Sequence, residues 1–149
     1  MFQHNNPGER VDKSDAENVQ IIHTCAGLFG YYLSVGTSDF YANDGRYQPG
    51  CGIDFFGVCA HLRSYKYFAE SITNPKGFLG TRADGATAYM GGATLDPKAK
   101  GTYYFKTNSE YPFLINRALL AWIIIVSFKR IKGSGKGRKL GSRSIPRCV

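Results

Sequence analysis

Apolar residues in the first 115 positions fall into short runs separated by glycine, proline and asparagine. Three runs rich in β-branched or aromatic residues predict strands over 19–23, 35–41 and 102–107. Between the last two, 61–72 holds neither Gly nor Pro, and its apolar residues recur at spacings of three and four. This spacing predicts an amphipathic helix whose apolar residues are Leu62, Tyr65, Phe68, Ala69 and Ile72.

Two other segments lack long apolar runs. Ser14, with Glu17 three residues later, predicts one short helical turn capped by Ser14. Residues 80–101 are rich in glycine and poor in apolar residues, which predicts a loop. The resulting order of strand, loop, strand, loop, helix and strand is typical of the later part of an α/β sheet rather than of a complete domain.

Composition places the chain among globular proteins. Its 149 residues suffice for one domain, and 43% hydrophobic with 20% charged residues excludes the disordered and fibrous classes. The net charge of +8 belongs to residues 116–149, which hold nine of the 19 Lys and Arg and none of the 11 acidic residues. The sequence therefore predicts a near-neutral domain over 1–115 with a separate tail, and disfavours a nucleic-acid partner.

The tail combines an apolar run with a basic stretch. The run covers 118–128, and its 11 residues are fewer than the ~18 that a membrane-spanning helix needs. We therefore expect no transmembrane span, and interpret the run as an interfacial or core segment. The basic Gly/Ser-rich stretch 129–139 could bind anionic lipid or nucleic acid, but a disordered extension outside the domain is the favoured interpretation.

The four cysteines indicate in which redox compartment the protein is found. Cys51 and Cys59 are close together and flanked by glycine, which suits a small disulfide-closed loop in an oxidising compartment. The N-terminus lacks the charged segment followed by an apolar segment that marks a secretory signal. No such signal is visible, and we expect the true N-terminus to be missing. Cys25 is expected to be a buried or free thiol, although pairing with Cys148 stays open.

Three histidines differ in context. His61 stands at a loop-to-helix junction, where α/β-hydrolases place the general base of a triad ordered Ser, Asp or Glu, then His. His23, beside Ile21 and Ile22, is interpreted as structural, and His4 as a solvated loop residue. A zinc site from Cys51, Cys59, His61 and His23 is disfavoured, because seven residues between the cysteines do not fit the usual spacing of two to four.

Seven motifs follow one another between residues 2 and 113. They are Val11-Asp12-Lys13-Ser14-Asp15-Ala16, Val19-Gln20-Ile21-Ile22-His23-Thr24, Asp39-Phe40-Tyr41 with Asn43 and Gly45, Gln48-Pro49-Gly50-Cys51, Cys59-Ala60-His61-Leu62-Arg63-Ser64, Tyr67-Phe68-Ala69-Glu70-Ser71-Ile72, and Gly101-Thr102-Tyr103-Tyr104 with Thr107, Pro112 and Phe113. Each motif is weak alone. In this order they resemble the animal pancreatic-lipase family of α/β-hydrolases, closest to insect lipases and phospholipases A1.

The resemblance implies a fold and a site. It implies a partial α/β-hydrolase fold comprising the C-terminal strands and the helix after the catalytic histidine. It assigns His61 as the triad base and implies that Cys51 and Cys59 form the disulfide closing the lid loop. Because only seven residues lie between them, the lid is too short to cover the active site. We expect a secreted lipid ester hydrolase acting on phospholipid or acylglycerol at a lipid–water interface, with no cofactor or metal.

The departures from the family limit what this chain is expected to do alone. No serine lies in the family's GxSxG pattern, and the family's Asp-Pro acid is expected before Met1. Asp96-Pro97 follows His61, which is the wrong order, and the family's extra cysteines are missing near 81–85. We therefore expect the isolated chain to be inactive. Two alternatives stay open: a catalytically inactive lipid-binding or storage homologue, and a gene fragment without an independent fold.

Overall fold

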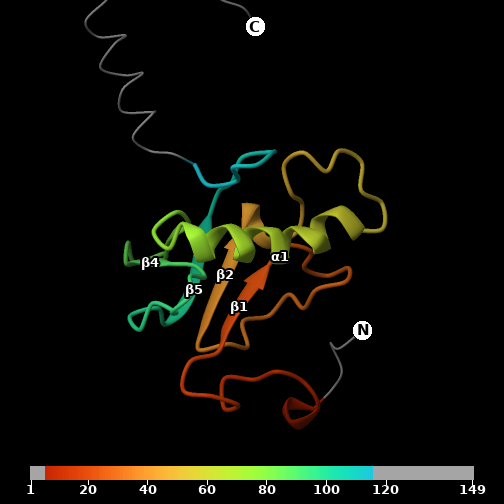
Figure 1. Cartoon of the computed structure of the whole chain (residues 1–149). Helices are drawn as coiled ribbons and strands as arrows, with labels where there is room; N and C mark the ends of the chain where they lie inside the picture. The colour runs from red at the N-terminus through yellow and green to blue at the C-terminus, as the bar shows by residue number, and fades with distance from the viewer. Residues whose placement is uncertain (1–5, 116–149) are drawn as a thin grey trace, which may run out of the picture. The chain divides into compact units, whose positions relative to one another are not determined.

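The computed structural model describes residues 6–115, and Figure 1 shows one long helix crossing a sheet. The predictions for 118–128, for the basic stretch, for the domain boundary of the tail, and for His4 and Cys148 lie outside the described residues. The elements are η1 (Pro7–Glu9), β1 (Gln20–His23), β2 (Ser38–Ala42), η2 (Asn43–Gly45), α1 (Val58–Thr73), β3 (Leu79–Thr81), β4 (Thr87–Tyr89) and β5 (Gly101–Phe105).

The sheet is mixed, with the strand order β1-β2-β5-β3-β4. Strands β1, β2 and β5 are parallel, and their register aligns Ile22 with Phe40 and Phe40 with Tyr103. The three predicted strands are confirmed, but β2 begins at residue 38 rather than 35. The chain turns before β2 because the Asp39 carboxylate accepts backbone N–H groups from residues 35 and 36.

The loop predicted over 80–101 is only partly correct. Strands β3 and β4 form an antiparallel hairpin that pairs Leu79 with Tyr89. The hairpin turns at Asp84 and Gly85, where the Asp84 carboxylate accepts the N–H of Ala86 at 3.0 Å. Each strand has three residues, too few for an apolar run to be visible in the sequence. The Asp-Gly pair was the one local signal for this turn.

The helical turn predicted at Ser14 is absent. The segment forms a turn in which the Asp12 side chain accepts the N–H of Ser14 at 3.2 Å, and the Asp15 side chain accepts the N–H of Asp12 at 2.7 Å. The carboxylates of Asp12 and Asp15 therefore satisfy the local backbone, and the expected pairing of Ser14 with Glu17 does not form.

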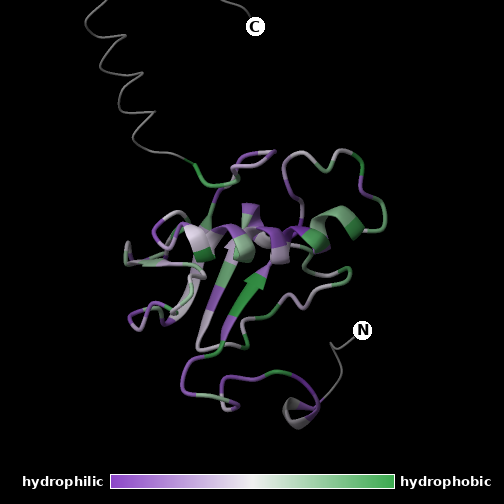
Figure 2. Ribbon diagram, viewed as in Figure 1, coloured by the Kyte–Doolittle hydropathy of each residue, from purple (hydrophilic) through white to green (hydrophobic). Residues whose placement is uncertain are grey.

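Helix α1 is confirmed, but the apolar stripe that predicted it faces outward. The side chains of Leu62, Tyr65, Phe68 and Ile72 are between 40% and 57% exposed. The middle of α1 is hydrophilic in Figure 2 even though the helix lies along the sheet. Its buried residues are Ala60, Arg63, Tyr67, Glu70 and Ser71. No helix among residues 6–115 is long and apolar enough to cross a membrane.

Tyr67 shows how a polar residue becomes the centre of the interface between α1 and the sheet. Its ring is fully buried against Phe105 and Phe113 in edge-on contacts. Its hydroxyl donates to Gln48 Oε1 at 3.1 Å and lies 3.0 Å from Thr107 Oγ1. Burial raises the pKa of Tyr67 above its ordinary value, so the phenol stays neutral in the core.

The C-terminal half of α1 holds the last described segment. The Glu70 carboxylate accepts the backbone N–H of Phe113 at 2.8 Å and that of Leu114 at 3.2 Å. About two turns earlier, the Arg63 guanidinium donates to the Ser109 carbonyl at 2.8 Å and stacks 4.6 Å from the Phe113 ring. These hydrogen bonds explain how charged side chains are buried beneath the helix.

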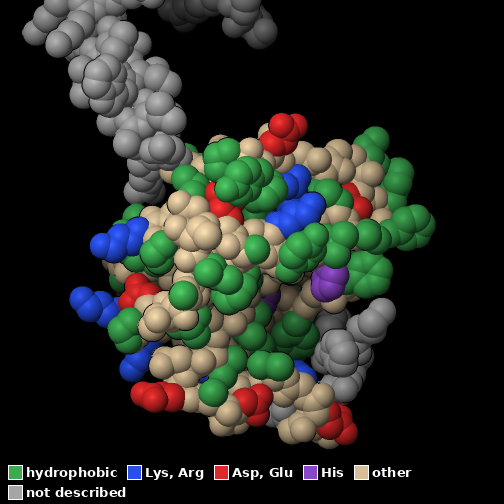
Figure 3. Space-filling view, in the orientation of Figure 1, with side chains coloured by type: hydrophobic (Ala, Val, Ile, Leu, Met, Phe, Trp, Pro, Cys, Tyr) green, Lys and Arg blue, Asp and Glu red, His purple; other side chains and the backbone are tan. Residues whose placement is uncertain are grey.

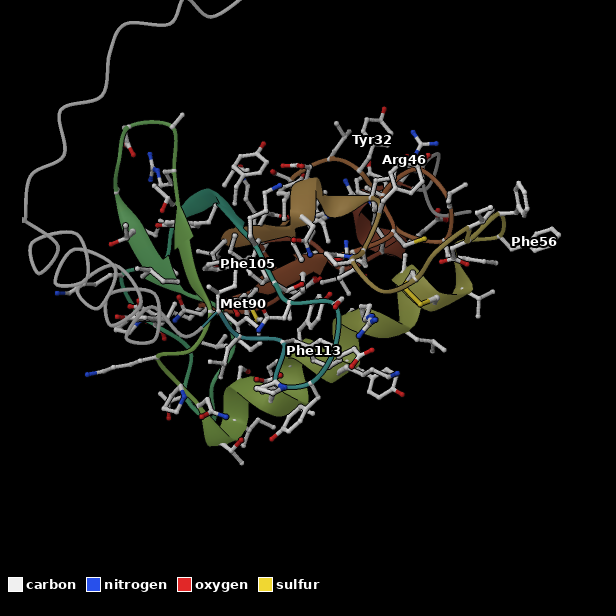
Figure 4. The ribbon with its side chains drawn as sticks, turned by 90° about the horizontal axis from the view of Figure 1, so that it is seen from above. Tyr32, Arg46, Phe56, Met90, Phe105 and Phe113 are labelled. Carbon is white, nitrogen blue, oxygen red and sulfur yellow. A yellow bond between two sulfur atoms is a disulfide. The ribbon has the colours of Figure 1, made fainter. Side chains whose placement is uncertain are left out.

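The hydrophobic core lies between α1 and one face of the sheet. Figure 4 shows Met90, Phe105 and Phe113 converging on this region from different segments. The core consists of Phe40, Ala42, Tyr67, Phe78, Ala88, Met90, Ala99, Tyr103, Phe105 and Phe113.

Candidate functional site

A short disulfide-closed loop precedes α1. The bond joins Cys51 to Cys59, whose Cα atoms lie 5.7 Å apart, and seven residues lie between them. We call residues 52–58 the lid, whose last residue, Val58, is also the first residue of α1. Three of its side chains are among the most exposed apolar residues: Ile53 at 82%, Phe55 at 82% and Phe56 at 78%. In Figure 4 Phe56 points away from the body of the molecule.

His61 lies in the first turn of α1, three residues after the last residue of the lid. Its N–H donates to the Gly57 carbonyl at 2.8 Å, which opens the helical hydrogen-bond ladder. Its ring is exposed and packs 5.7 Å from the Phe29 ring, centroid to centroid. Figure 3 shows an exposed histidine bordered by hydrophobic side chains, and His61 is the exposed histidine of the described residues. Within 6–115 no side chain hydrogen-bonds its imidazole, so a ring nitrogen is available for proton transfer.

The root of the lid is fixed by Gly57 and Cys25. Gly57 has φ +70°, and a Cβ there would lie only 2.6 Å from Cys25 Sγ, so a larger residue would clash as well as strain the backbone. The Cys25 thiol donates to the Gly57 carbonyl at 3.2 Å and is buried, as the sequence predicted. The loop after β1 thereby supports the root of the lid, beside the turn of α1 that carries His61.

The lid root also brings possible metal ligands together. Ligand atoms of Cys51, Asp54 and Cys59 lie within 4.8 Å of one another. The disulfide, however, removes the thiolates through which cysteine binds zinc. These residues therefore do not fit a metal ion, and the zinc arrangement weighed from the sequence is not formed by them.

His23 takes part in a separate buried pair. Its Nε2 lies 2.9 Å from Asp39 Oδ1 and its Nδ1 lies 2.9 Å from the Tyr31 carbonyl oxygen. The side chains of His23 and Asp39 are each 2% exposed, and the Tyr41 ring stacks on the imidazole at 4.0 Å. Both ring nitrogens are occupied and no substrate could approach them. The structural role predicted for His23 is confirmed.

Asp39 and Tyr41 extend this pair into the loop before β2. Besides His23, the Asp39 carboxylate accepts the N–H groups of Val35 at 3.1 Å and Gly36 at 3.0 Å. The Tyr41 hydroxyl donates to the Tyr32 carbonyl at 2.9 Å. Burial raises the pKa of Tyr41, and the neighbouring Asp39 charge adds to the effect. The pair therefore anchors this loop to β1 and β2 rather than serving proton transfer.

Asp96 does not serve as an acid beside His61. One oxygen of its carboxylate accepts the N–H of Tyr89 at 3.1 Å, and the other accepts that of Lys98 at 2.9 Å. The residue closes the turn after β4. This agrees with the sequence argument that Asp96-Pro97 follows His61 in the wrong order.

Removing the disulfide is expected to weaken the fold modestly. The double substitution Cys51→Ser with Cys59→Ser should lower the free energy of unfolding by about 2 kcal/mol, the low end for a disulfide, because the closed ring is very small. Urea unfolding followed by circular dichroism measures the difference. A reducing agent should destabilise the parent chain by the same amount and leave the double variant unchanged. A variant as stable as the parent would contradict this expectation.

Comparisons with known proteins agree on one family. A sequence model of the family described as Lipase matches residues 1–113. Phospholipase A1 of Polybia paulista is 45% identical over 80 residues, covering 54% of this chain and 24% of that protein. Phospholipase A1 of Vespula vulgaris is 35% identical over 127 residues, covering 78% and 38%. Pancreatic triacylglycerol lipase of Cavia porcellus is 38% identical over 110 residues, covering 59% and 24%. The chain thus spans well under half the length of these relatives.

Proposed function

Because the chain belongs to the lipase family, a family of α/β-hydrolases, we propose that it supplies the general base and the lid of a lipid ester hydrolase. The base is His61. The observation that carries this assignment is an exposed imidazole, without a hydrogen-bonding side chain in 6–115, in the first turn of the helix that follows the lid. The parallel strands β1, β2 and β5 beside α1 are consistent with part of the family fold.

In this proposal His61 acts within a serine triad. A serine Oγ attacks the acyl carbonyl carbon while His61 takes the hydroxyl proton, and His61 then returns the proton to the leaving alcohol oxygen. A carboxylate orients the imidazole, and backbone N–H groups bind the oxyanion. The serine and the carboxylate are proposed to come from residues outside the described part of this chain. Within 6–115 no side chain hydrogen-bonds the His61 imidazole, and the Ser64 hydroxyl donates only to the His61 backbone carbonyl.

The lid supports a lipid substrate. Ile53, Phe55 and Phe56 expose apolar side chains beside the site, and burial of such a side chain is worth about 1.5–3 kcal/mol each. We infer that these residues enter a lipid–water interface. A lid of seven residues leaves the site open, which favours phospholipids, with their bulky head groups, over triglycerides. The activity proposed is therefore phospholipase A1-like, and the disulfide fits secretion into an oxidising compartment.

A second candidate function is lipid binding without catalysis. The feature that favours it is the same lone imidazole, because a base without a nucleophile or an orienting acid does little. The apolar lid would still bind a lipid surface. The two functions differ in whether the complete protein carries a serine within reach of His61.

The transcript and its product test the proposal. Sequencing upstream of the Met1 codon should find an in-frame GxSxG and an Asp-Pro, and the full-length protein should release fatty acid from phosphatidylcholine vesicles faster than from triolein emulsions. A serine-directed fluorophosphonate should label it. Vesicle binding without fatty acid release or labelling would support the lipid-binding alternative. Faster release from triolein would contradict the phospholipid preference but not the hydrolase assignment.

A further inference from the structure

Asp54 is a half-buried acid in the middle of an exposed apolar lid. Its neighbours Ile53 and Phe55 are each 82% exposed, whereas the Asp54 side chain turns inward to α1. Its Oδ2 accepts the N–H of Ala60 at 2.8 Å, and its carbonyl accepts the N–H of Gly57 at 3.1 Å. A single residue thereby ties the apolar lid to the first turn of the helix.

The start of α1 needs an acceptor that its own N-cap residue lacks. The first N–H groups of a helix have no partner within the helix, and a side-chain oxygen at the N-cap ordinarily accepts one of them. Here the N-cap residue is Gly57, which has no side chain. Asp54 supplies the missing oxygen from three residues earlier, and its negative charge also interacts favourably with the positive end of the helix dipole.

This hydrogen bond acts on the residue next to His61. Asp54 fixes the N–H of Ala60, and the following N–H, that of His61, donates to Gly57. We expect removal of the carboxylate to fray the first turn and to shift the imidazole. The disulfide and the contact of Cys25 with Gly57 would still hold the lid root, so the fold as a whole should survive.

We propose that Asp54 is a positioning residue for His61, a role that rests on the proposed function of His61 as the general base. It acts through the backbone of the first turn of α1 and does not touch the substrate. A general base must lie within hydrogen-bond reach of the proton it takes, and small displacements of a catalytic group reduce the rate strongly. Loss of Asp54 should therefore lower kcat and leave KM for a small soluble ester unchanged.

Steady-state kinetics on the full-length protein that contains this chain test the proposal. With p-nitrophenyl butyrate, and with active sites counted by complete fluorophosphonate labelling, Asp54→Ala should lower kcat on the order of tenfold at constant KM. Asp54→Asn keeps an oxygen that can accept the same N–H and should restore kcat to within about twofold. Asp54→Glu moves the carboxylate by one methylene and gives a second, milder disruption if the alanine variant does not fold.

Asp84→Ala is the matched control. Asp84 accepts the N–H of Ala86 in the β3–β4 turn. The substitution therefore removes the same kind of hydrogen bond at a site remote in sequence from the lid. Its kcat should equal that of the parent. Hydrogen exchange of the Ala60 and His61 amides should quicken in Asp54→Ala and not in Asp84→Ala.

The outcomes separate this role from the proposed function. If His61→Ala is inactive while Asp54→Ala keeps the parent kcat, or if Asp54→Asn fails to restore kcat, the positioning role is wrong and the function stands. If His61→Ala stays active, the proposed function itself fails. A fall in active-site concentration at unchanged kcat would reduce Asp54 to a purely structural role and would also overturn the positioning role.

Discussion

Replacing His61 by alanine is expected to lower kcat for ester hydrolysis in the full-length protein by about 10⁴-fold or more, the usual consequence of removing a triad member. The fold should be unaffected, because the His61 side chain is exposed and, within residues 6–115, its one aromatic contact is with Phe29. Fatty acid release from phosphatidylcholine vesicles measures the activity, and urea unfolding measures the stability.

Lys66→Ala is a suitable control for that experiment. Lys66 is also exposed on α1 and is not part of the proposed site, so its substitution should change neither kcat nor stability. A His61→Ala protein with the parent activity would exclude His61 as the base. The assignment would also be contradicted if the activity of His61→Ala fell only as far as the amount of folded protein did.

The largest effect on stability is expected at Asp39. Asp39→Ala should lower the free energy of unfolding by about 3–5 kcal/mol, because it leaves a buried histidine and two partly buried N–H groups without their acceptor. Urea unfolding followed by circular dichroism measures the loss. Asp39→Asn keeps the size and one acceptor oxygen, and should lose less.

Asp44→Ala gives the matched comparison for Asp39→Ala. Asp44 pairs with Lys106 at 2.7 Å, but the two side chains are 77% and 61% exposed. An exposed ion pair contributes only about 0–1 kcal/mol. Equal losses from Asp39→Ala and Asp44→Ala would show that the His23–Asp39 pair does not anchor the sheet.

The main elements could be predicted because their sequence signals are local. β1, β2 and β5 each contain enough consecutive β-branched or aromatic residues to stand out, and the spacing of apolar residues identifies α1. The strands β3 and β4 were missed, since three-residue strands leave no run to detect. Periodicity also gives only the helical conformation, and it does not say which face is buried when polar residues such as Tyr67 and Glu70 find partners.

The candidate site, like the fold, could be predicted from the sequence only in part. His61 and the two lid cysteines are visible in the sequence, because they lie within a few residues of one another and match a family motif. Cys25 supports Gly57 from 32 residues away, and the bond from Asp54 to Ala60 depends on how the lid folds back. Neither contact leaves a pattern along the chain, so only the three-dimensional arrangement reveals it.

The buried polar face of α1 has a consequence for the helix as a rigid rod. Apolar contacts tolerate small rotations about the helix axis, whereas hydrogen bonds do so poorly, because they depend on direction. Turning α1 by one residue, about 100°, would break the bonds of Arg63, Tyr67 and Glu70 together. These three anchors therefore set the angular orientation of the rod, and with it the direction in which the imidazole at position 61 leaves the helix.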